Sequence, residues 1–324
     1  MQLDILRPSS ELQLRSFSEI DEFRPVELLA RCRSIPLDVA SFAPIRAVVR
    51  LPQCDIVVQR SFARLLDSEY QIPGSLLIVP LDGNVRASAN GIALDSRSIV
   101  ALRGNVDCRI VEPTPNQHAA LIFSGSLRDR DWFSACDKLV TMSADGADLR
   151  VVRQVLLMIL RIASTEPHLV KDHSFAQNLQ EKLLLAIDDL FSRSECSDFR
   201  HHAGNRATDI VRRVDEHVST HPTTVMYSAD LAAACGVSVR ALHEAFKCVR
   251  GMSLHRYLRH RKAYSVRERL LKGGDGISVS GCARAHGFYH LSEFSRFYRN
   301  TFNETPSATL AHSNGTIPSR SHAM

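Results

Sequence analysis

The feature that most constrains this chain is residues 228–250, whose pattern predicts two helices joined by a tight turn. Residues 229–235 are small and favour a helix, and the tripeptide Gly236-Val237-Ser238 follows them directly. Glycine takes the left-handed conformation that ends many helices, and serine is a favourable N-cap for the next helix. Two helices connected in this way form the outline of a helix-turn-helix motif.

The second predicted helix of this motif separates apolar from polar residues along its length. The apolar positions, expected to face inward, are Val239, Leu242, Phe246 and Val249. The polar positions, expected to face outward, are Arg240, His243, Glu244 and Lys247. Such a row carries hydrogen-bond donors and an acceptor that can reach base edges in a DNA groove. An ordinary solvent-exposed helix face has the same composition, so both interpretations stay open at this point.

A comparable plan is repeated near the end of the chain. Residues 279–286 predict a short helix with Val279 and Ala283 on its inner side, Gly287-Phe288 predicts the turn, and residues 291–301 predict a longer helix. The residues expected to pack inward are Phe294, Phe297 and Tyr298. The outward row consists of Ser292, Arg296 and Arg299, with Glu293 beside it.

Residues 253–272 predict a connector helix between the two motifs, capped by Ser253 and ended by Gly273-Gly274. Twenty helical residues span about 30 Å, and successive major grooves on one side of DNA lie about 34 Å apart. The connector therefore suits two reading helices that enter neighbouring grooves. We expect some of its basic side chains to approach phosphates and others to pair with acids or cover the core. These side chains are Arg256, Arg259, Arg261, Lys262, Arg267 and Arg269.

With these landmarks in order, residues 207–310 resemble the DNA-binding domain of the AraC/XylS family of bacterial transcription regulators. The matching residues include Asp230-Leu231-Ala232, Gly236-Val237-Ser238, Leu242, Phe246, Gly251, Ser253, Tyr257-Leu258, Leu270, Val279, Ala283, Gly287-Phe288, Ser292, Phe294-Ser295-Arg296-Phe297 and Thr305-Pro306-Ser307. The resemblance implies a sequence-specific DNA-binding domain. It assigns base or phosphate contacts to Arg240, His243, Glu244 and Lys247 in the first motif and to Ser292, Glu293, Arg296 and Arg299 in the second.

The chain departs from the family pattern at a few positions. An Arg-Leu pair common in the connector is Lys262-Ala263 here, and the small residue that often follows is Val266. The glycine that usually precedes the terminal proline is absent, and Asn303-Glu304 stands in its place. These changes affect packing and helix ends more than the outward rows.

The distribution of charge agrees with a polyanion-binding C-terminal unit. Residues 207–310 hold 15 Lys and Arg against 9 Asp and Glu, whereas residues 1–206 hold 24 against 26. The C-terminal segment is therefore basic and the N-terminal segment nearly neutral. A solvated basic face would have the same charge, so this observation supports DNA binding only together with the motifs.

Residues 24–125 predict a β-rich domain, since short apolar runs alternate with turn dipeptides such as Pro73-Gly74 and Asn90-Gly91. The expected strands lie within residues 48–58, 75–79, 98–102 and 119–123. The spacing favours a small barrel or sandwich, and the region resembles the cupin-like sensor domains of the same family. Two amphipathic helices are expected within about 148–193, either for dimer contact or for packing against the barrel.

Nothing in the sequence indicates an enzyme. Metal-dependent cupin enzymes use several histidines, and residues 1–150 contain only His118. No phosphate-binding loop, nucleophile elbow or dinucleotide fingerprint is present. The eight cysteines include no C-x-x-C pair. We therefore expect no catalytic residue, metal or cofactor, and the absence of a signal-peptide pattern or long apolar stretch predicts a cytoplasmic protein without a membrane partner.

The sequence thus predicts an α+β multidomain fold. A cupin-like sensor or dimerisation domain occupies residues 1–195, a linker 196–206, a DNA-binding domain with two helix-turn-helix motifs 207–310, and a disordered tail 311–324. The expected function is regulation of transcription, with activation favoured by the family resemblance. The partners implied are double-stranded DNA, RNA polymerase, a small-molecule effector and a second copy in a homodimer. The alternatives are an effector-independent regulator whose N-terminal domain only dimerises, and a cupin-type enzyme with an accessory DNA-binding domain.

Overall fold

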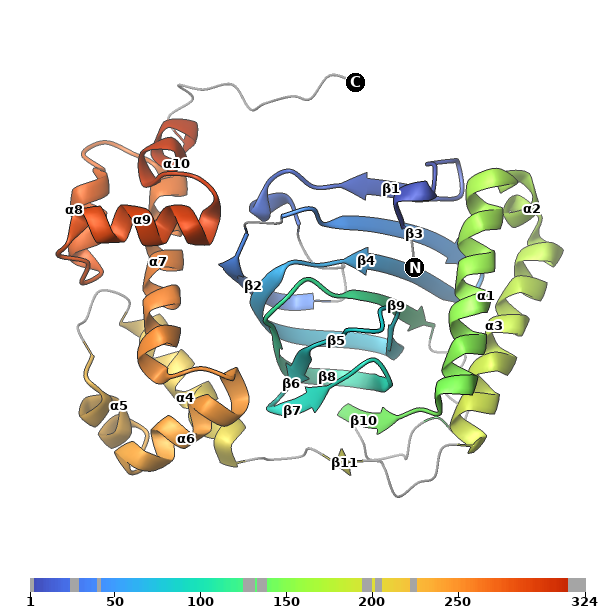
Figure 1. The fold of residues 1–324 in the computed structure, drawn as a ribbon, viewed down its shortest axis with the longest axis horizontal. Helices are drawn as coiled ribbons and strands as arrows, with labels where there is room; N and C mark the ends of the chain where they lie inside the picture. Colours follow the sequence, from blue (N-terminus) through green and yellow to red (C-terminus); the bar gives the residue numbers. More distant parts are fainter. Residues whose placement is uncertain are drawn as a thin grey trace. The chain divides into compact units, whose positions relative to one another are not determined.

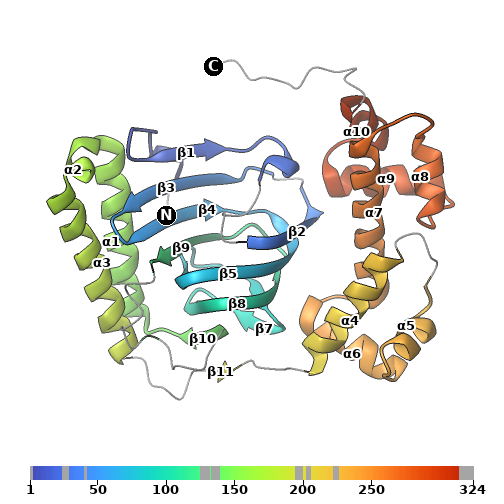
Figure 2. The same ribbon diagram turned by 180° about the vertical axis from the view of Figure 1, so that it is seen from behind.

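The computed structural model describes residues 3–23, 29–39, 42–124, 132, 139–193, 200–201, 206–221 and 226–313. The chain divides into two compact units, and the main boundary between them lies between residues 203 and 204. The first unit is built from strands covered by helices, and the second is mostly helical (Figures 1 and 2). This is the α+β, two-domain layout that the sequence predicts.

The first unit contains one largely antiparallel sheet, whose hydrogen-bonded order is β1-β3-β4-β9-β5-β8-β10-β11. Strand β2 pairs with β5, and the short hairpin β6–β7 lies beside β8. The strands are β1 (Gln13–Ser16), β2 (Leu29–Asp38), β3 (Ile45–Leu51), β4 (Cys54–Arg60), β5 (Ala63–Pro80), β6 (Ala87–Ala89), β7 (Ile92–Leu94), β8 (Ser98–Glu112), β9 (Gln117–Phe123), β10 (Leu139–Ser143) and β11 (Arg200–His201). Two 3-10 helices, Leu3–Ile5 and Ile20–Glu22, lie beside β1 in the sequence.

The structure corrects two expectations about these strands. Residues 48–58 form parts of β3 and β4 rather than one strand, because a turn at Pro52 and Gln53 pairs Leu51 with Cys54. The sheet is also open rather than a closed barrel within the part of the chain that the structure describes. Its end strands, β1 and β11, are short and pair with β3 and β10, not with each other.

Successive side chains of a strand point to opposite faces of the sheet, and both faces of this sheet carry apolar clusters. On one face, Ala47, Val49 and Ile56 pack in a core that also contains helical residues such as Leu156 and Leu183. The other face has its own cluster, which is drawn from several strands. Its members include Val57, Tyr70, Leu76, Val100, Leu102 and Ala120.

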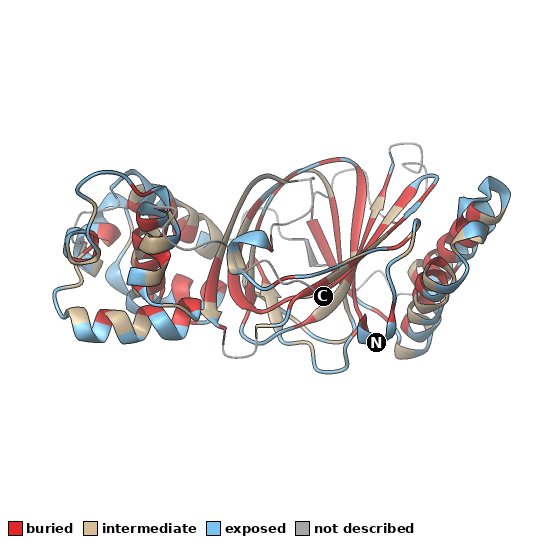
Figure 3. Cartoon of the chain, turned by 90° about the horizontal axis from the view of Figure 1, so that it is seen from above, coloured by how far each residue is buried: buried red, intermediate tan, exposed pale blue. Residues whose placement is uncertain are grey.

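Two long helices, α1 (Gly146–Thr165) and α3 (His173–Arg193), cover the first of these faces, with the short α2 (Pro167–Lys171) between them (Figure 3). They lie where the sequence predicts a helical pair. Asp145 caps α1, since its Oδ1 accepts a hydrogen bond from the Ala147 amide at 2.6 Å. The two helices therefore pack on the sheet, which is one of the two roles that the sequence left open.

The second unit includes residues 34–41 and 63–65, and its part from residue 204 onward is helical in the described segments. Its helices are α4 (Arg206–Thr220), α5 (Ser228–Ala234), α6 (Val239–Arg250), α7 (Leu254–Lys272), α8 (Val279–Ala285), α9 (Leu291–Phe302) and α10 (Pro306–Ser313). Within the expected linker, residues 200–201 form β11 and Arg206 begins α4, and the other positions lie outside the described residues. Of the expected tail, residues 311–313 complete α10 and the rest lie outside the described residues. None of the helices in the described segments is long and apolar enough to cross a membrane.

Candidate nucleic-acid interface

The first helix-turn-helix motif is formed by α5 and α6, and its turn has the predicted chemistry. Gly236 has a φ of +61°, in the left-handed region where glycine has no steric penalty. Ser238 caps α6, because its hydroxyl accepts a hydrogen bond from the Ala241 amide at 3.1 Å. The angle between the two helices is thus set by residues that are local in the sequence.

Helix α6 presents all four of its predicted reading residues to solvent. Its buried stripe is formed by Leu242, Ala245, Phe246 and Val249. The exposed residues of the opposite row are Arg240, His243, Glu244 and Lys247. The prediction for Val239 is wrong, since this side chain is 41% exposed. Val239 is the first residue of the helix, and the buried stripe begins one turn later.

The second motif, α8 and α9, repeats this construction. Gly287 has a φ of +84°, and the amide of Phe288 donates back to the Ala283 carbonyl at 2.9 Å, which closes the turn. Phe294 and Tyr298 are fully buried, whereas Phe297 is only half-buried. The predicted reading residues on the outer face of α9 are all exposed. They are Ser292, Glu293, Arg296 and Arg299.

Both glutamates of these rows are paired with an arginine. Glu244 accepts from Arg240 on the same helix at 2.8 Å, and both side chains stay mostly exposed. Glu293 accepts from Arg259 of α7, also at 2.8 Å. A carboxylate in such a row can accept a hydrogen bond from a cytosine amino group or orient a neighbouring arginine. In the unbound protein each of them makes the arginine contact.

Helix α7 connects the two motifs as a single 19-residue rod, about 28 Å long at 1.5 Å per residue. Ser253 caps it by accepting from the Arg256 amide at 3.3 Å. Its basic side chains differ in how far they are buried. Arg256 and Arg269 are exposed and Arg259 and Lys262 are half-buried, whereas Arg261 and Arg267 are buried.

A buried ionic cluster joins the first motif to α4 and α7. Arg250 is fully buried at the end of α6 and donates to Asp215 of α4 at 2.8 Å. Tyr257 of α7 donates its hydroxyl to the other oxygen of the same carboxylate. Sequence reasoning missed this cluster, although Arg250 lies four residues after Phe246 and so continues the buried side of α6.

A second polar cluster joins the second motif to α7 and α10. Arg267 of α7 pairs with Glu304, and Thr309 of α10 donates to Glu304 at 2.8 Å. Tyr298 of α9 and Thr309 share a 2.8 Å hydrogen bond, and burial raises the pKa of Tyr298 to about 12. Just before this cluster, Asn303 ends α9 with a φ of +58°, in the position where the family glycine is absent. Asparagine tolerates this conformation better than most residues, so this departure leaves the helix end intact.

In the β-rich unit, His118 belongs to a polar row across three strands. Its ring nitrogen lies 2.7 Å from the side-chain nitrogen of Gln59, whose oxygen accepts from Arg46 at 3.2 Å. The three residues are register partners on β3, β4 and β9. No group of His, Cys, Asp or Glu among the described residues is arranged to hold a metal ion. The sequence alone does not reveal this row, because only strand pairing brings its members together.

Comparison with known proteins finds a family match that lies within the helical unit. A family described as "Helix-turn-helix domain" matches residues 231–312. The chain is 37% identical over 143 residues to the XylDLEGF operon transcriptional activator 1 of Pseudomonas putida, a match covering 44% of this chain and 40% of that protein. It is 31% identical over 159 residues to XylDLEGF operon transcriptional activator 2 of the same species, covering 48% of this chain and 95% of that protein.

Among solved structures, a probable AraC family transcriptional regulator from Rhodopseudomonas palustris is 30% identical. That match covers 32% of this chain and 97% of the other, with a TM-score of 0.31. The chain thus spans less than half of the length of activator 1 and nearly all of the length of activator 2.

Proposed function

Because this chain belongs to the AraC/XylS family of transcription regulators, we propose that it binds specific DNA sequences through α6 and α9. The observation that carries this proposal is the pair of helix-turn-helix motifs on one continuous connector, with eight polar reading residues exposed on two helices. A 28 Å rod suits the spacing of about 34 Å between successive major grooves. Each motif then reads one groove on the same side of the duplex.

Two of the arginines on the reading faces, Arg240 and Arg296, have the chemistry to recognise guanine. A guanidinium can donate two hydrogen bonds to the major-groove edge of guanine, and a good pair contributes about 1–3 kcal/mol of discrimination. Glu244 and Glu293 each orient an arginine through one carboxylate oxygen, and the other oxygen has the chemistry to accept from cytosine. His243, Lys247, Ser292 and Arg299 supply further base or phosphate contacts.

The β-rich unit provides the regulatory half of this proposal. The two P. putida relatives are named transcriptional activators, so we propose activation, with a small-molecule effector bound by the β-rich unit. The effector would shift the population of a DNA-competent state. A homodimer and a contact with RNA polymerase belong to the same proposal. Bacterial DNA lies in the cytoplasm, which is where this regulator would act.

DNA recognition is tested by selecting duplexes from a random pool with the full-length protein. We expect a recovered motif with two boxes about one helical turn apart. Arg296→Ala should weaken binding to this motif more than binding to random DNA. Equal losses on both would reduce Arg296 to a phosphate contact, and recovery of no motif by the native protein would refute the proposal.

Effector binding is tested separately by thermal unfolding of the protein against a panel of metabolites. A ligand that binds only the folded state raises the unfolding temperature, and the same ligand should change the affinity for the selected duplex. A ligand that did neither would have no regulatory role. If no member of a broad panel shifted either quantity, the effector-independent alternative would be preferred.

A further inference from the structure

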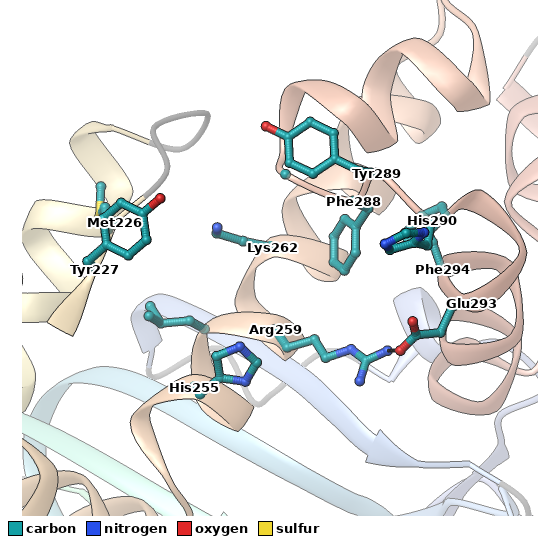
Figure 4. Close-up of a pocket in the computed structure, with 12 residues that line it drawn as sticks. Met226, Tyr227, His255, Arg259, Lys262, Phe288, Tyr289, His290, Glu293 and Phe294 are labelled. Atoms are coloured by element: carbon teal, nitrogen blue, oxygen red, sulfur yellow. Dashed lines mark hydrogen bonds and ion pairs between the residues drawn. The ribbon is translucent and has the colours of Figure 1, made fainter.

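A pocket of about 390 Å³ lies within the helical unit, between the two helix-turn-helix motifs (Figure 4). Its floor is one face of the connector α7, whose lining residues recur at helical spacing. They are His255, Leu258, Arg259 and Lys262. One wall comes from Met226 and Tyr227 before α5, and the other from the α8–α9 turn and the first turn of α9. The pocket therefore touches both motifs at once.

The charges of this pocket leave one cation without a counter-ion. Arg259 is paired with Glu293, the acidic residue that lines the pocket. Lys262 makes no ion pair with any side chain in the described part of the chain. Burial lowers the pKa of its amine, which means that the charged form has lost part of its hydration. An anion beside the amine would restore the lost interaction.

The turn of the second motif passes close to this amine. A side chain at Gly287 would place its Cβ 3.4 Å from Lys262 Nζ, and the φ of +84° there also favours glycine. Figure 4 shows the amine between Tyr227 on one side and Phe288 and Tyr289 on the other. Tyr227 and Tyr289 are largely exposed, so their hydroxyls are available as donors at the rim.

The position of the pocket identifies its occupant. Glu293, one of the predicted reading residues, forms part of its wall, so a duplex that engages α9 brings its backbone close to the pocket. A duplex read by both α6 and α9 must also pass over the connector. We propose that this pocket seats a backbone phosphate of the bound DNA, with Lys262 as its charge partner. This inference rests on the proposed function, because it requires the two motifs to bind one duplex.

The test compares the full-length protein with Lys262→Gln, using the duplex selected by the native protein. Each phosphate neutralised steepens the dependence of log affinity on log salt by about 0.9. We expect Lys262→Gln to make this slope shallower by about 0.9 while the recovered sequence motif stays the same. Lys182→Gln, an exposed position on α3, removes the same charge and should leave the slope unchanged. Thermal unfolding of both variants verifies that they are folded.

A scan of single methylphosphonate substitutions along the duplex locates the phosphate. The native protein should lose affinity, by roughly 3- to 10-fold, at a phosphate between the two boxes, and Lys262→Gln should be insensitive there. Identical slopes or identical scans for the two proteins would overturn the inference. A third outcome would also overturn the inference. If inorganic phosphate stabilised the native protein but not Lys262→Gln, and the two proteins had the same salt slope, the pocket would bind a free anion rather than DNA. Failure of the proposed function is distinguishable, because it shows in the native protein alone as the absence of any selected motif.

Discussion

At the residue scale, the helical unit is held together by buried polar groups rather than by apolar packing alone. Asp215 receives hydrogen bonds from Arg250 and Tyr257, so one carboxylate joins α4, α6 and α7. Glu304 has a comparable position beside Arg267 and Thr309. Removing one partner of a buried ion pair strands the other charge, which costs far more than the pair itself contributes.

We therefore expect Asp215→Ala to lower the free energy of unfolding of the helical unit by about 3–5 kcal/mol. Asp209→Ala is the matched control, because this acid lies on the same helix and pairs with Arg212 and Arg213 at the surface. The control should cost less than about 1 kcal/mol. Denaturant titration measures both values, and similar losses in the two variants would show that the buried cluster has no special role.

His260 predicts how stability depends on pH. Burial lowers the pKa of this imidazole to about 4, assisted by the nearby charges of Arg256 and Arg259. The folded state thus binds the proton less tightly than the unfolded state, in which the pKa is about 6.5. The contribution of His260 to stability is complete above about pH 6.5 and is lost as the pH falls towards 4.

The corresponding measurement is the free energy of unfolding between pH 7 and pH 4.5, for the native protein and for His260→Gln. The native protein should lose about 2 kcal/mol more than the variant over this range. Parallel curves for the two proteins would mean that His260 titrates normally in the folded state.

At the scale of elements, the two motifs were predictable because their determinants are local. Gly236 and Gly287 adopt positive φ angles in the turns of the two motifs. Ser238 caps α6 and Ser253 caps α7. Turns and caps of this kind depend on a few consecutive residues. The outward rows of α6 and α9 followed from helical periodicity, and only Val239 and Phe297 were placed too deeply.

Features that depend on distant segments could not be predicted in this way. The Asp215 cluster joins residues 35 and 42 positions apart, and the row of Arg46, Gln59 and His118 exists only through strand register. The same limit applies to the sheet, since closure depends on whether the end strands pair. The pocket over α7 likewise needs both motifs in place.

Substitutions at the helix N-caps test whether the two helix-turn-helix motifs are built in the same way. Ser238→Ala removes the cap of α6 and should cost about 1 kcal/mol, whereas Ser238→Gly should cost only a few tenths. Ser278 makes the equivalent bond to the Gly281 amide at 3.1 Å, so Ser278→Ala should have a similar effect on α8. Denaturant titration would contradict this account if Ser238→Ala and Ser238→Gly were equally stable.

At the scale of the whole molecule, the proposed function depends on a fixed distance between the two helices α6 and α9. The connector α7 is continuous, and the two buried clusters attach one motif to each part of it. The β-rich unit has buried apolar clusters on both faces of its sheet.

The most direct test of this account is the affinity of the full-length protein for its selected duplex after base pairs are inserted between the two boxes. A rigid connector predicts that insertions of five and of ten base pairs both reduce affinity at least about tenfold, to that of a single box, since a 28 Å rod cannot reach a groove one turn further away. Unchanged affinity after either insertion, or recovery with ten base pairs, would contradict the claim that one connector holds both helices in neighbouring grooves.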